Sequence, residues 1–488
     1  MKTPSTEQAA AIASQASRLV LCAGAGSGKS FVLVHRIAQA IANGADPAKV
    51  IAISFTVQAG RILADRLAVL GIAGLRHVGT IHALCLAESH KFPTWGMRRP
   101  LIIDEDMQDE MINAELTRLR LNKVVPVRDV AATLAVFAAD KAKPSISNRA
   151  YAPAKAVRRA MVAAGQSSMD LLLGEAVAYL PGCLGELDAL FWDEFQDTAA
   201  GDYALLEQVE AKSKTVVGDE MQSIFGFRGS SPDYFRHLAA SQDWQQLTLA
   251  DNYRSNAAIV DAANRLTAGQ AGAITMRHIR RDDWTPPTIG NYATEAAEID
   301  AIREWLTTRP TGSRAILCRH NALADRLRLA LADALPPCPA LAIDPVMIRR
   351  AMAAIQWADR SAADWLRESH DLLPYINHFA GLVSSTRREA LLPAMAEALA
   401  QAEAQAVYDF GGLYIGTVHG AKGLEWDHVL VAGVEQTSWP CTAEIMRLFY
   451  TAITRARDSL NITCARQRPS FYGKGWTDSE MASIVAKL

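Results

Sequence analysis

The chain has 488 residues, more than a single hydrophobic core usually organises, so we expect about two to four domains. Half of the residues are hydrophobic and 21% are charged, as in a globular protein, and no run is apolar enough to predict a signal peptide or a membrane span. The net charge of −2 means that nucleic acid would need a local basic surface, and the seven cysteines form no C-x-x-C pair, which argues against a zinc or iron–sulfur site. These features predict a cytoplasmic protein without a membrane partner.

A glycine-rich stretch near the N-terminus carries the strongest chemical signal. Residues 22–30, C-A-G-A-G-S-G-K-S, follow an apolar strand pattern and precede a helical one, an arrangement that cradles a triphosphate. Backbone N–H groups of small residues surround the phosphate oxygens, and the helix N-terminus adds partial positive charge. Lys29 would reach the β- and γ-phosphates and Ser30 would ligate Mg²⁺, although Ala23 stands where the general pattern has its first glycine.

Strand and helix patterns alternate after this stretch. Strand-like runs at 50–56 and 77–82 are separated by a helical pattern, which predicts a parallel sheet with right-handed crossovers. Residues 90–175 are helical and alanine-rich, and we interpret them as an inserted subdomain. Within it, residues 141–160 hold six basic and no acidic side chains, which predicts a basic face; a solvated loop with a chance excess of charge is the alternative.

The rest of the chain predicts a second α/β domain. Strand-like runs return at 189–192 and 214–219, a helix-rich stretch then extends to about residue 270, and a polar connection covers 278–292. Further strand-like runs, interrupted by a helical segment at 335–410, occur at 315–319, 413–417, 428–433 and 460–464.

Paired carboxylates and an amide follow two of these strands. An NTPase needs one carboxylate to hold Mg²⁺ and one to polarise the attacking water, and Asp193 and Glu194 fit these roles. Gln222 is placed to sense a γ-phosphate, while Phe225 and Phe227 are candidates for stacking on bases. Taken alone, two such phenylalanines are more typical of a core.

Two arginines far from the glycine-rich stretch are candidates for the γ-phosphate. Arg254 lies in N-Y-R-S and Arg455 in Y-T-A-I-T-R-A-R. An arginine on that phosphate neutralises charge in the transition state, although each alone is more typical of a surface ion pair.

Together these motifs resemble those of the superfamily 1A DNA helicases, the UvrD/Rep/PcrA family. They occur in family order across nearly the whole chain: Gln8, A-G-A-G-S-G-K-S, S-F-T, G-T-I-H, W-D-E-F-Q-D, G-D-E-M-Q-S-I-F-G-F-R-G, N-Y-R-S, T-V-H-G-A-K-G-L-E-W and Y-T-A-I-T-R-A-R. The family also has alanine at the position of Ala23, which removes the objection to the phosphate loop.

The resemblance implies an α/β fold with two RecA-like P-loop NTPase motor domains and helical insertions. It places domain 1A at 1–89 and 179–270, with insertion 1B at 90–178 between its parts. It places domain 2A at 271–334 and 411–488, with a reduced 2B-like insertion at 335–410. ATP would lie in the cleft between the motor domains, and single-stranded DNA would cross both.

The resemblance also implies site residues. It assigns catalytic roles to Lys29, Asp193, Glu194, Gln222, Arg254 and Arg455. It assigns Mg²⁺ binding to Ser30 and Asp193. It assigns ATP binding to Gln8, Ala23, Gly24, Ala25, Gly26, Ser27, Gly28, Lys29, Ser30, Arg36, Tyr253 and Glu425. Among these, Gln8 and Arg36 would approach the adenine, Tyr253 would stack on it, and Glu425 would accept from the ribose. It assigns DNA binding to Phe55, Thr56, His82, Phe225, Phe227, Arg228, Thr417 and His419.

Several positions depart from the family pattern. Val57 and Gln58 replace the usual Asn-Lys, Ile81-His82-Ala83 replaces Phe-His-Ser, and Phe227 stands where the family has Trp. These changes leave the ATP motifs intact but put some DNA contacts in doubt. The segment 335–410 is also much shorter than the 2B insertion of the family.

Two functions follow from these observations. The first is an ATP-dependent single-stranded-DNA translocase and helicase, of 3′→5′ polarity by resemblance, acting on single-stranded or tailed duplex DNA. The second is an ATP- and DNA-sensing subunit of a larger complex, such as an anti-phage system with a nuclease partner, without processive unwinding. An RNA helicase of superfamily 1B is a distant third, and a nuclease domain within this chain is not expected.

Overall fold

The computed structural model describes residues 3–103, 105–137, 148–280, 284–308, 311–331, 413–435, 439 and 442–467. Its contacts divide these residues into two compact units. Unit 1 holds those within 1–286 and 441–454, and unit 2 holds those within 287–440 and 455–486. The division after residue 286 lies close to the predicted 1A/2A boundary, and the six predicted domain segments stay predictions. The predicted segment 335–410 lies outside the described residues.

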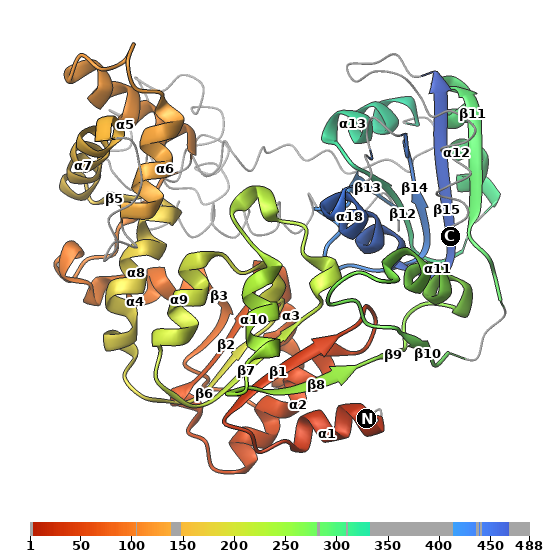
Figure 1. Cartoon of the computed structure of the whole chain (residues 1–488), viewed down its shortest axis with the longest axis horizontal. Coiled ribbons are helices and arrows are strands. Elements are labelled where there is room, and N and C mark those ends of the chain that lie inside the picture. Colours follow the sequence, from red (N-terminus) through yellow and green to blue (C-terminus); the bar gives the residue numbers. More distant parts are fainter. Residues whose placement is uncertain are drawn as a thin grey trace, which may run out of the picture. The chain divides into compact units, whose positions relative to one another are not determined.

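Unit 1 is built on a parallel sheet of six strands in the order β3-β2-β6-β7-β1-β8 (Figure 1). Five of these strands occur where apolar runs predict them, and each is followed by a helix or a functional loop. Their bounds are β1 Arg18–Ala23, β2 Val50–Ser54, β3 His77–Thr80, β6 Leu187–Trp192, β7 Ala211–Gly218 and β8 Gln245–Leu249.

Helices cover both faces of this sheet. Successive side chains of a buried strand point to opposite faces, so both faces are apolar and both must be covered. On β1, Leu19 and Leu21 pack with α1 (Thr6–Ala13), α2 (Lys29–Ala42) and α3 (Val57–Val69), while Val20 joins the opposite core. That opposite core includes side chains from four helices: α4 (Ile81–Glu88), α8 (Met169–Leu184), α9 (Ala200–Gln208) and α10 (Pro232–Ala240). The mixed α/β fold with parallel sheets confirms the predicted fold class and agrees with two RecA-like domains.

The segment predicted as an insertion is largely helical and has a core of its own. It comprises α5 (Glu105–Arg118), α6 (Val127–Phe137), α7 (Asn148–Ala163) and the start of α8, with the two-residue strands β4 (Leu101–Ile102) and β5 (Gln166–Ser167) paired beside them. Buried apolar residues of these helices, such as Leu116, Leu134 and Met161, form one cluster. Of the predicted basic face, Arg149, Lys155 and Arg159 are exposed, whereas Arg158 pairs with Glu175.

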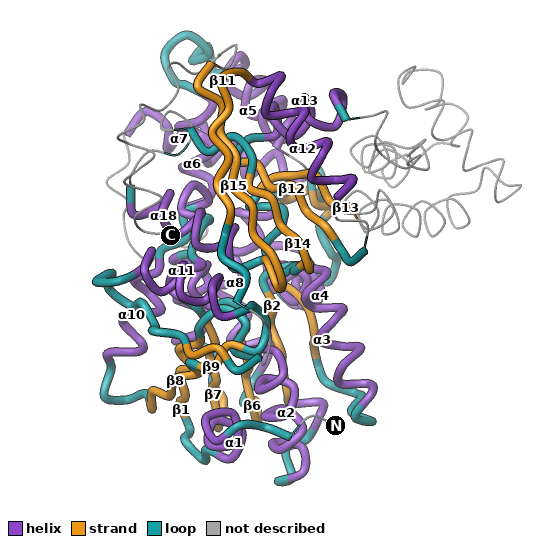
Figure 2. Tube along the Cα trace, turned by 90° about the vertical axis from the view of Figure 1, so that its right-hand side faces the viewer, coloured by secondary structure: helices purple, strands orange, loops and turns teal. Residues whose placement is uncertain are grey.

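Unit 2 contains a second parallel sheet, of five strands in the order β11-β15-β14-β12-β13 (Figure 2). Helices α12 (Glu295–Thr308) and α13 (Asn321–Ala330) pack on it through Ile302, Trp305 and Leu327. Its strands are β11 Thr288–Thr294, β12 Arg314–Cys318, β13 Leu413–Thr417, β14 Trp426–Val431 and β15 Ala456–Gln467.

Two strands of the two large sheets differ from the sequence expectation. The stretch predicted to be helix-rich contains β8, and the predicted connection 278–292 contains the start of β11. Both are edge strands with mostly exposed or half-buried residues. Edge strands lack the continuous apolar run that identifies a central strand, so their sequence pattern is weak.

The remaining described helices of unit 1 are α11 (Ala257–Thr267) and α18 (Ala443–Ile453), which pack together. Short η helices and the pair β9 (Asp251–Asn252) and β10 (Arg277–His278) complete the fold. Among the described residues, no helix combines the length and the apolar character needed to cross a membrane.

Candidate nucleotide and nucleic-acid site

Most of the predicted site residues of unit 1 gather at the carboxyl edge of its sheet. The phosphate loop follows β1, Asp193 and Glu194 follow β6, Gln222 lies just after β7, and Arg254 comes shortly after β8. Since parallel strands all end at the same edge, segments more than 200 residues apart in the sequence meet there. Ligands of open α/β sheets bind at this edge.

The phosphate loop has the backbone conformation that its glycines permit. Gly26 and Gly28 have φ values of +67° and +82°, a region that L side chains rarely adopt. Gly28 is the N-cap of α2 and contributes no side-chain cap, so the first backbone N–H groups of that helix are left for a ligand. The Ser27 hydroxyl is buried and forms no hydrogen bond with any described residue, which also suits a polar ligand.

Side chains from two other segments hold this loop in place. Gln8 donates from Nε2 to the Ser27 carbonyl at 3.0 Å, and Asn252 donates from Nδ2 to the Ala25 carbonyl at 2.7 Å. The Tyr253 backbone N–H donates to the Gly26 carbonyl at 2.9 Å. A β-carbon on Gly26 would lie only 2.8 Å from the Asn252 amide, so the close approach requires glycine. Gln8 and Tyr253, two of the three residues predicted to contact adenine, therefore both adjoin the loop.

A tyrosine from α18 also reaches the loop. Tyr450 Oη accepts from the Ala25 N–H at 3.4 Å and lies 3.3 Å from Asp219 Oδ2, to which its hydroxyl donates. Tyr450 is 2% exposed, and the hydrogen bonds place it among groups at the ends of β1 and β7. Tyr450, Asp219 and Asn252 all lie inside the motifs quoted above, but they were not among the predicted site residues.

Carboxylates cluster opposite the loop. Asp193 is 7% exposed and its Oδ1 accepts from the Glu194 N–H at 2.9 Å. Glu194 has φ +52°, a left-handed conformation that is uncommon outside glycine and that occurs at functional sites. Burial raises the pKa of Asp219, nearby Lys29 opposes this rise, and Glu194 adds to it. A cation at this position would relieve the repulsion among these acids.

The donor set fits Mg²⁺ carried in with a nucleotide. Mg²⁺ prefers oxygen ligands and usually takes one or two side chains together with phosphates and water. The Ser30 hydroxyl and the Asp193 carboxylate are oxygen donors of this kind. Within the described part of the chain, no three His, Cys, Asp or Glu side chains are grouped to hold a metal by themselves. The phosphates would therefore supply much of the coordination.

The predicted arginines lie in different surroundings. Arg254 donates from Nη1 to the Thr454 carbonyl at 3.0 Å, and its β-carbon lies near Gly26 of the loop. Arg455, in unit 2, is 2% exposed and donates to the Leu424 carbonyl at 3.2 Å. Arg36 donates to the carbonyls of Ala11, Ile12 and Ser14, where it caps the end of α1. Its assignment to adenine stays a prediction.

Gln222 and Glu425 have defined hydrogen-bond partners. Gln222 donates from Nε2 to Asp219 Oδ2 at 2.6 Å and is 3% exposed. Glu425, which directly precedes β14 in unit 2, pairs with Arg457 at 2.5 Å and is half-buried.

Aromatic side chains after β2 and β7 form a short row at the same edge of the sheet. The Phe55 ring stacks on the Phe225 ring at 4.8 Å, and the Phe225 and Phe227 centroids are 6.0 Å apart. Phe225 is 7% exposed, whereas Phe227 is 65% exposed. Phe227 thus presents its ring to solvent, and Phe225 mainly supports the row by packing.

The other residues predicted to bind DNA lie near strand ends. Thr56 caps α3 by accepting from the Ala59 N–H at 3.1 Å, and His82 is half-buried in the first turn of α4. In unit 2, Thr417 ends β13 and accepts from the Gly420 N–H at 3.2 Å, while His419 is half-buried just beyond. The Arg228 side chain lies outside the described part of the structure.

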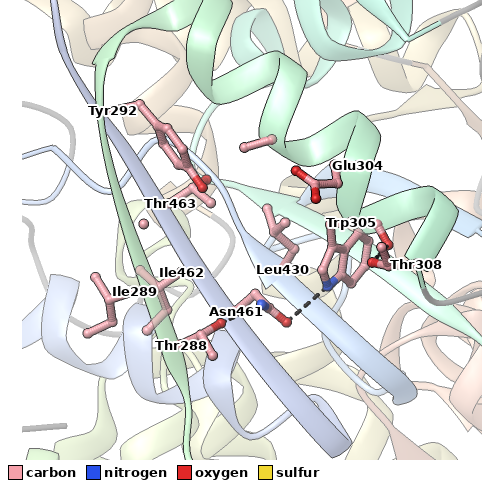
Figure 3. A pocket seen from close by; sticks show the side chains of 12 residues that line it. Thr288, Ile289, Tyr292, Glu304, Trp305, Thr308, Leu430, Asn461, Ile462 and Thr463 are labelled. Carbon is pink, nitrogen blue, oxygen red and sulfur yellow. Dashed lines mark hydrogen bonds between the residues drawn. The ribbon is translucent and has the colours of Figure 1, made fainter.

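A pocket of about 290 Å³ in unit 2 is a separate feature (Figure 3). Side chains of β11, β15 and α12 line it, including Tyr292, Trp305 and Asn461, and the Trp305 indole donates to Asn461 Oδ1 at 2.9 Å. None of its twelve described lining residues is basic, and Glu304 is acidic. Its lining therefore does not suit a triphosphate or a DNA backbone.

Comparison with protein-family models shows to which family this chain belongs. The N-terminal domain model of the UvrD/REP helicases matches residues 4–169 and 181–243, and the UvrD-like helicase C-terminal domain model matches residues 368–467. The chain belongs to the UvrD/Rep helicase family. This confirms the family predicted from the motif order.

Individual members of the UvrD/Rep family are similar over different lengths. The ATP-dependent DNA helicase UvrD2 of Mycobacterium tuberculosis is 26% identical over 95% of this chain and 78% of its own length. The ATP-dependent DNA helicase PcrA of Staphylococcus aureus is 29% identical over 65% of this chain and 48% of its own. Among solved structures, the C-terminal domain of a possible DNA helicase from Lactobacillus matches 44% of this chain and 87% of that chain at 15% identity, with a TM-score of 0.25, too low to bear on the fold.

Proposed function

We propose that this UvrD/Rep family protein is an ATP-dependent translocase on single-stranded DNA and a DNA helicase of 3′→5′ polarity. One observation carries the proposal: the phosphate loop, the Asp193-Glu194 pair and the aromatic row all lie at one edge of the unit 1 sheet. A motor needs nucleotide and nucleic-acid groups close enough to influence each other. The names of the UvrD2 and PcrA relatives support the same activity.

The assignment of roles follows the chemistry of each group. Lys29 and the N–H groups of the loop bind the phosphates of ATP, and Ser30 and Asp193 hold Mg²⁺. Glu194 is the general base for the attacking water. Gln222 senses the γ-phosphate.

Other roles rest on the family resemblance together with position. Arg254 and Arg455 neutralise charge that develops on the γ-phosphate, and Glu425 accepts from the ribose. Gln8 and Tyr253 recognise the adenine. Phe227 stacks on a base, and Thr56, His82, Thr417 and His419 contact the strand. Binding and hydrolysis of ATP drive alternating grip on the DNA.

ATPase assays with and without single-stranded DNA test this function. We expect strong stimulation by DNA in the wild type and loss of both rates in Lys29→Ala, because the variant lacks the charge that holds the phosphates. Lys49→Ala is the matched control, since Lys49 is exposed in a short η helix (Pro47–Lys49) away from the loop. A basal rate that is indifferent to DNA would contradict the proposal.

Strand displacement on tailed duplexes tests the polarity. A 3′-tailed duplex should be unwound and a 5′-tailed one should not. Robust unwinding of the 5′-tailed substrate alone would show the opposite polarity and require the DNA contacts to be reassigned.

A second function is an ATP- and DNA-sensing subunit that acts with a nuclease partner. It is favoured by the short 335–410 segment and by Val57, which replaces a family asparagine and is 57% exposed at the start of α3. This alternative predicts DNA-stimulated ATPase with little unwinding until the partner is added. Robust unwinding by the chain alone would exclude it.

A further inference from the structure

The side chain of Gln196 connects two segments of the proposed ATPase site. Gln196 is the central residue of a short η helix (Phe195–Asp197) after β6 and has no exposed surface. Its Nε2 donates to Glu194 Oε2 at 2.5 Å and lies 3.3 Å from Asp197 Oδ2, while its Oε1 accepts from the Asp219 N–H at 3.1 Å. Its backbone carbonyl accepts from the Ser223 hydroxyl at 3.0 Å.

The orientation of this amide is fixed by its partners. A carboxylate can only accept hydrogen bonds when ionised, and a backbone N–H can only donate. The NH₂ group must therefore face Glu194 and the carbonyl oxygen must face Asp219. Glutamate at this position would place a third carboxylate beside Glu194 and Asp197, and alanine would remove the contacts with Glu194, Asp197 and Asp219.

One end of the connection is the predicted general base. Glu194 adopts φ +52°, so its backbone conformation is uncommon and its side chain must be directed by neighbouring groups. A hydrogen bond from Gln196 to Oε2 fixes one oxygen of the carboxylate. A base is effective only when it is within reach of the proton that it abstracts, so this bond affects the alignment of the attacking water.

The other end is the segment that leads to the aromatic row. Asp219 and Ser223 flank the η helix Glu220–Gln222. Phe225 lies two residues beyond Ser223 and stacks on Phe55. The contact is tight, because a β-carbon on Gly218 would lie 2.7 Å from Gln196 Oε1. A displacement of Asp219 or Ser223 after β7 would therefore disturb Gln196.

We propose that Gln196 is a positioning residue that couples DNA binding at the aromatic row to the alignment of Glu194. DNA that contacts Phe227 shifts or fixes the 219–227 segment, and the Asp219 and Ser223 hydrogen bonds transmit this change to Gln196. Gln196 then holds the Glu194 carboxylate in its productive position. The inference rests on the proposed function, since it requires an ATPase that responds to DNA. The physical basis is a hydrogen-bond network that joins Glu194 to Asp219 and Ser223, from which the backbone continues to the aromatic row.

ATPase kinetics of Gln196→Ala and Gln196→Met, with and without an oligo-dT strand, test the coupling. Thermal unfolding identifies variants that remain folded, and methionine fills the buried space that alanine leaves. We expect the ratio of DNA-stimulated to basal kcat to fall by about 5- to 150-fold, the usual size of coupling between two sites. The KM for ATP and the affinity for oligo-dT, measured by fluorescence anisotropy, should change less than about twofold.

A double-variant comparison distinguishes coupling from a structural role. If Gln196 acts through the aromatic row, Gln196→Met and Phe227→Ala together should lower the stimulation ratio no further than the more severe single variant. Gln208→Ala is the matched control, because Gln208 is exposed at the end of α9. An unchanged stimulation ratio in Gln196→Met, or fully additive losses in the double variant, would overturn the inference.

The wild type separates this inference from the proposed function. Absence of DNA stimulation in the wild type overturns both. Stimulation in the wild type that persists in folded Gln196 variants overturns the coupling alone.

Discussion

The two sheets of this protein share one architecture but place their candidate site residues differently. In unit 1, the loop after each of β1, β6 and β7 brings charged or polar groups to the carboxyl edge. In unit 2, Thr417 and His419 lie at the carboxyl edge, whereas Glu425 and Arg455 directly precede β14 and β15 and so lie at the amino edge. The same fold can therefore present different sets of candidate groups, because function depends on the loops.

Both units hold candidate site residues in networks of hydrogen bonds or ion pairs, but around different central residues, Asp219 in unit 1 and Arg457 in unit 2. The unit 1 groups belong to a network in which the side chains of Tyr450, Gln222 and Gln196 converge on Asp219. In unit 2, Arg455 donates to the Leu424 carbonyl, and Glu425 pairs with Arg457, which also pairs with Asp427. We therefore expect substitutions in both units to act through neighbouring side chains.

The largest expected effect tests whether unit 2 contributes to catalysis. Arg455→Ala should lower kcat by about 10³- to 10⁵-fold with little change in ATP binding, because an arginine on the γ-phosphate stabilises mainly the transition state. Steady-state kinetics and nucleotide-binding measurements check this. Arg326→Ala is the control, since Arg326 is about half exposed and pairs with Glu295 on α12. A loss of less than tenfold in folded Arg455→Ala would mean that unit 2 supplies no such arginine.

A somewhat smaller loss of kcat is expected when Glu194, the proposed general base in unit 1, is replaced. Glu194→Gln should lower kcat by about 10²- to 10⁴-fold, the range for removal of a general base, while ATP still binds. The amide retains the shape of the side chain but cannot take a proton. Single-turnover hydrolysis measures the chemical step, and Glu207→Gln on the exposed side of α9 serves as the matched variant. Wild-type rates in Glu194→Gln would remove Glu194 from the mechanism.

DNA affinity probes the aromatic row. Phe227→Ala should weaken binding of single-stranded DNA by about 1–3 kcal/mol, because the exposed ring is lost as a stacking surface. Fluorescence anisotropy with an oligo-dT strand measures the change. Trp284→Ala removes another exposed aromatic side chain of unit 1 and should leave affinity unaltered. Equal losses of DNA affinity in both variants would indicate that any exposed aromatic ring contributes, and not Phe227 specifically.

The smallest effects concern the free energy of unfolding. The contributions of Glu175 in unit 1 and Asp427 in unit 2 should depend on pH with opposite signs. In unit 1, burial raises the pKa of Glu175, although Arg158 opposes this rise. The stabilising contribution of Glu175 is therefore complete below its ordinary pKa of 4.5 and is lost as pH rises through the folded-state value. Glu175→Gln should gain unfolding free energy relative to the wild type as pH increases above about 4.5, as measured by hydrogen exchange of α8. A difference that is constant with pH would contradict this.

In unit 2, burial acts to raise the pKa of Asp427, but hydrogen bonds from Ser313 and Arg457 outweigh it and lower the pKa below its ordinary value of 3.8. This stabilisation is present above 3.8 and disappears as pH falls through the folded-state value. Asp427→Asn should cost about 1.5 kcal/mol at neutral pH and progressively less in acid. Hydrogen exchange of β14 between neutral and acidic pH measures it, and a cost that grows in acid would show the opposite sign.

The features that could be predicted from the sequence are local along the chain. A strand, a glycine-rich turn and a helix are adjacent in residues 18–42, so the order of the residues alone identifies the phosphate loop. The carboxylates after β6 and the order of the family motifs are equally local, and these led to the correct family and fold class. Central strands were found because both of their faces are apolar.

The contacts between distant groups depend on the folded chain. Packing brings Tyr450 to the phosphate loop and Gln196 between Glu194 and Asp219, and no spacing in the sequence encodes either contact. It also places Arg36 on the end of α1 and adds the edge strands β8 and β11, whose mixed composition gives no apolar run. Hydrogen bonds between segments more than 20 residues apart depend on sheet order and helix packing, and these are properties of the whole fold.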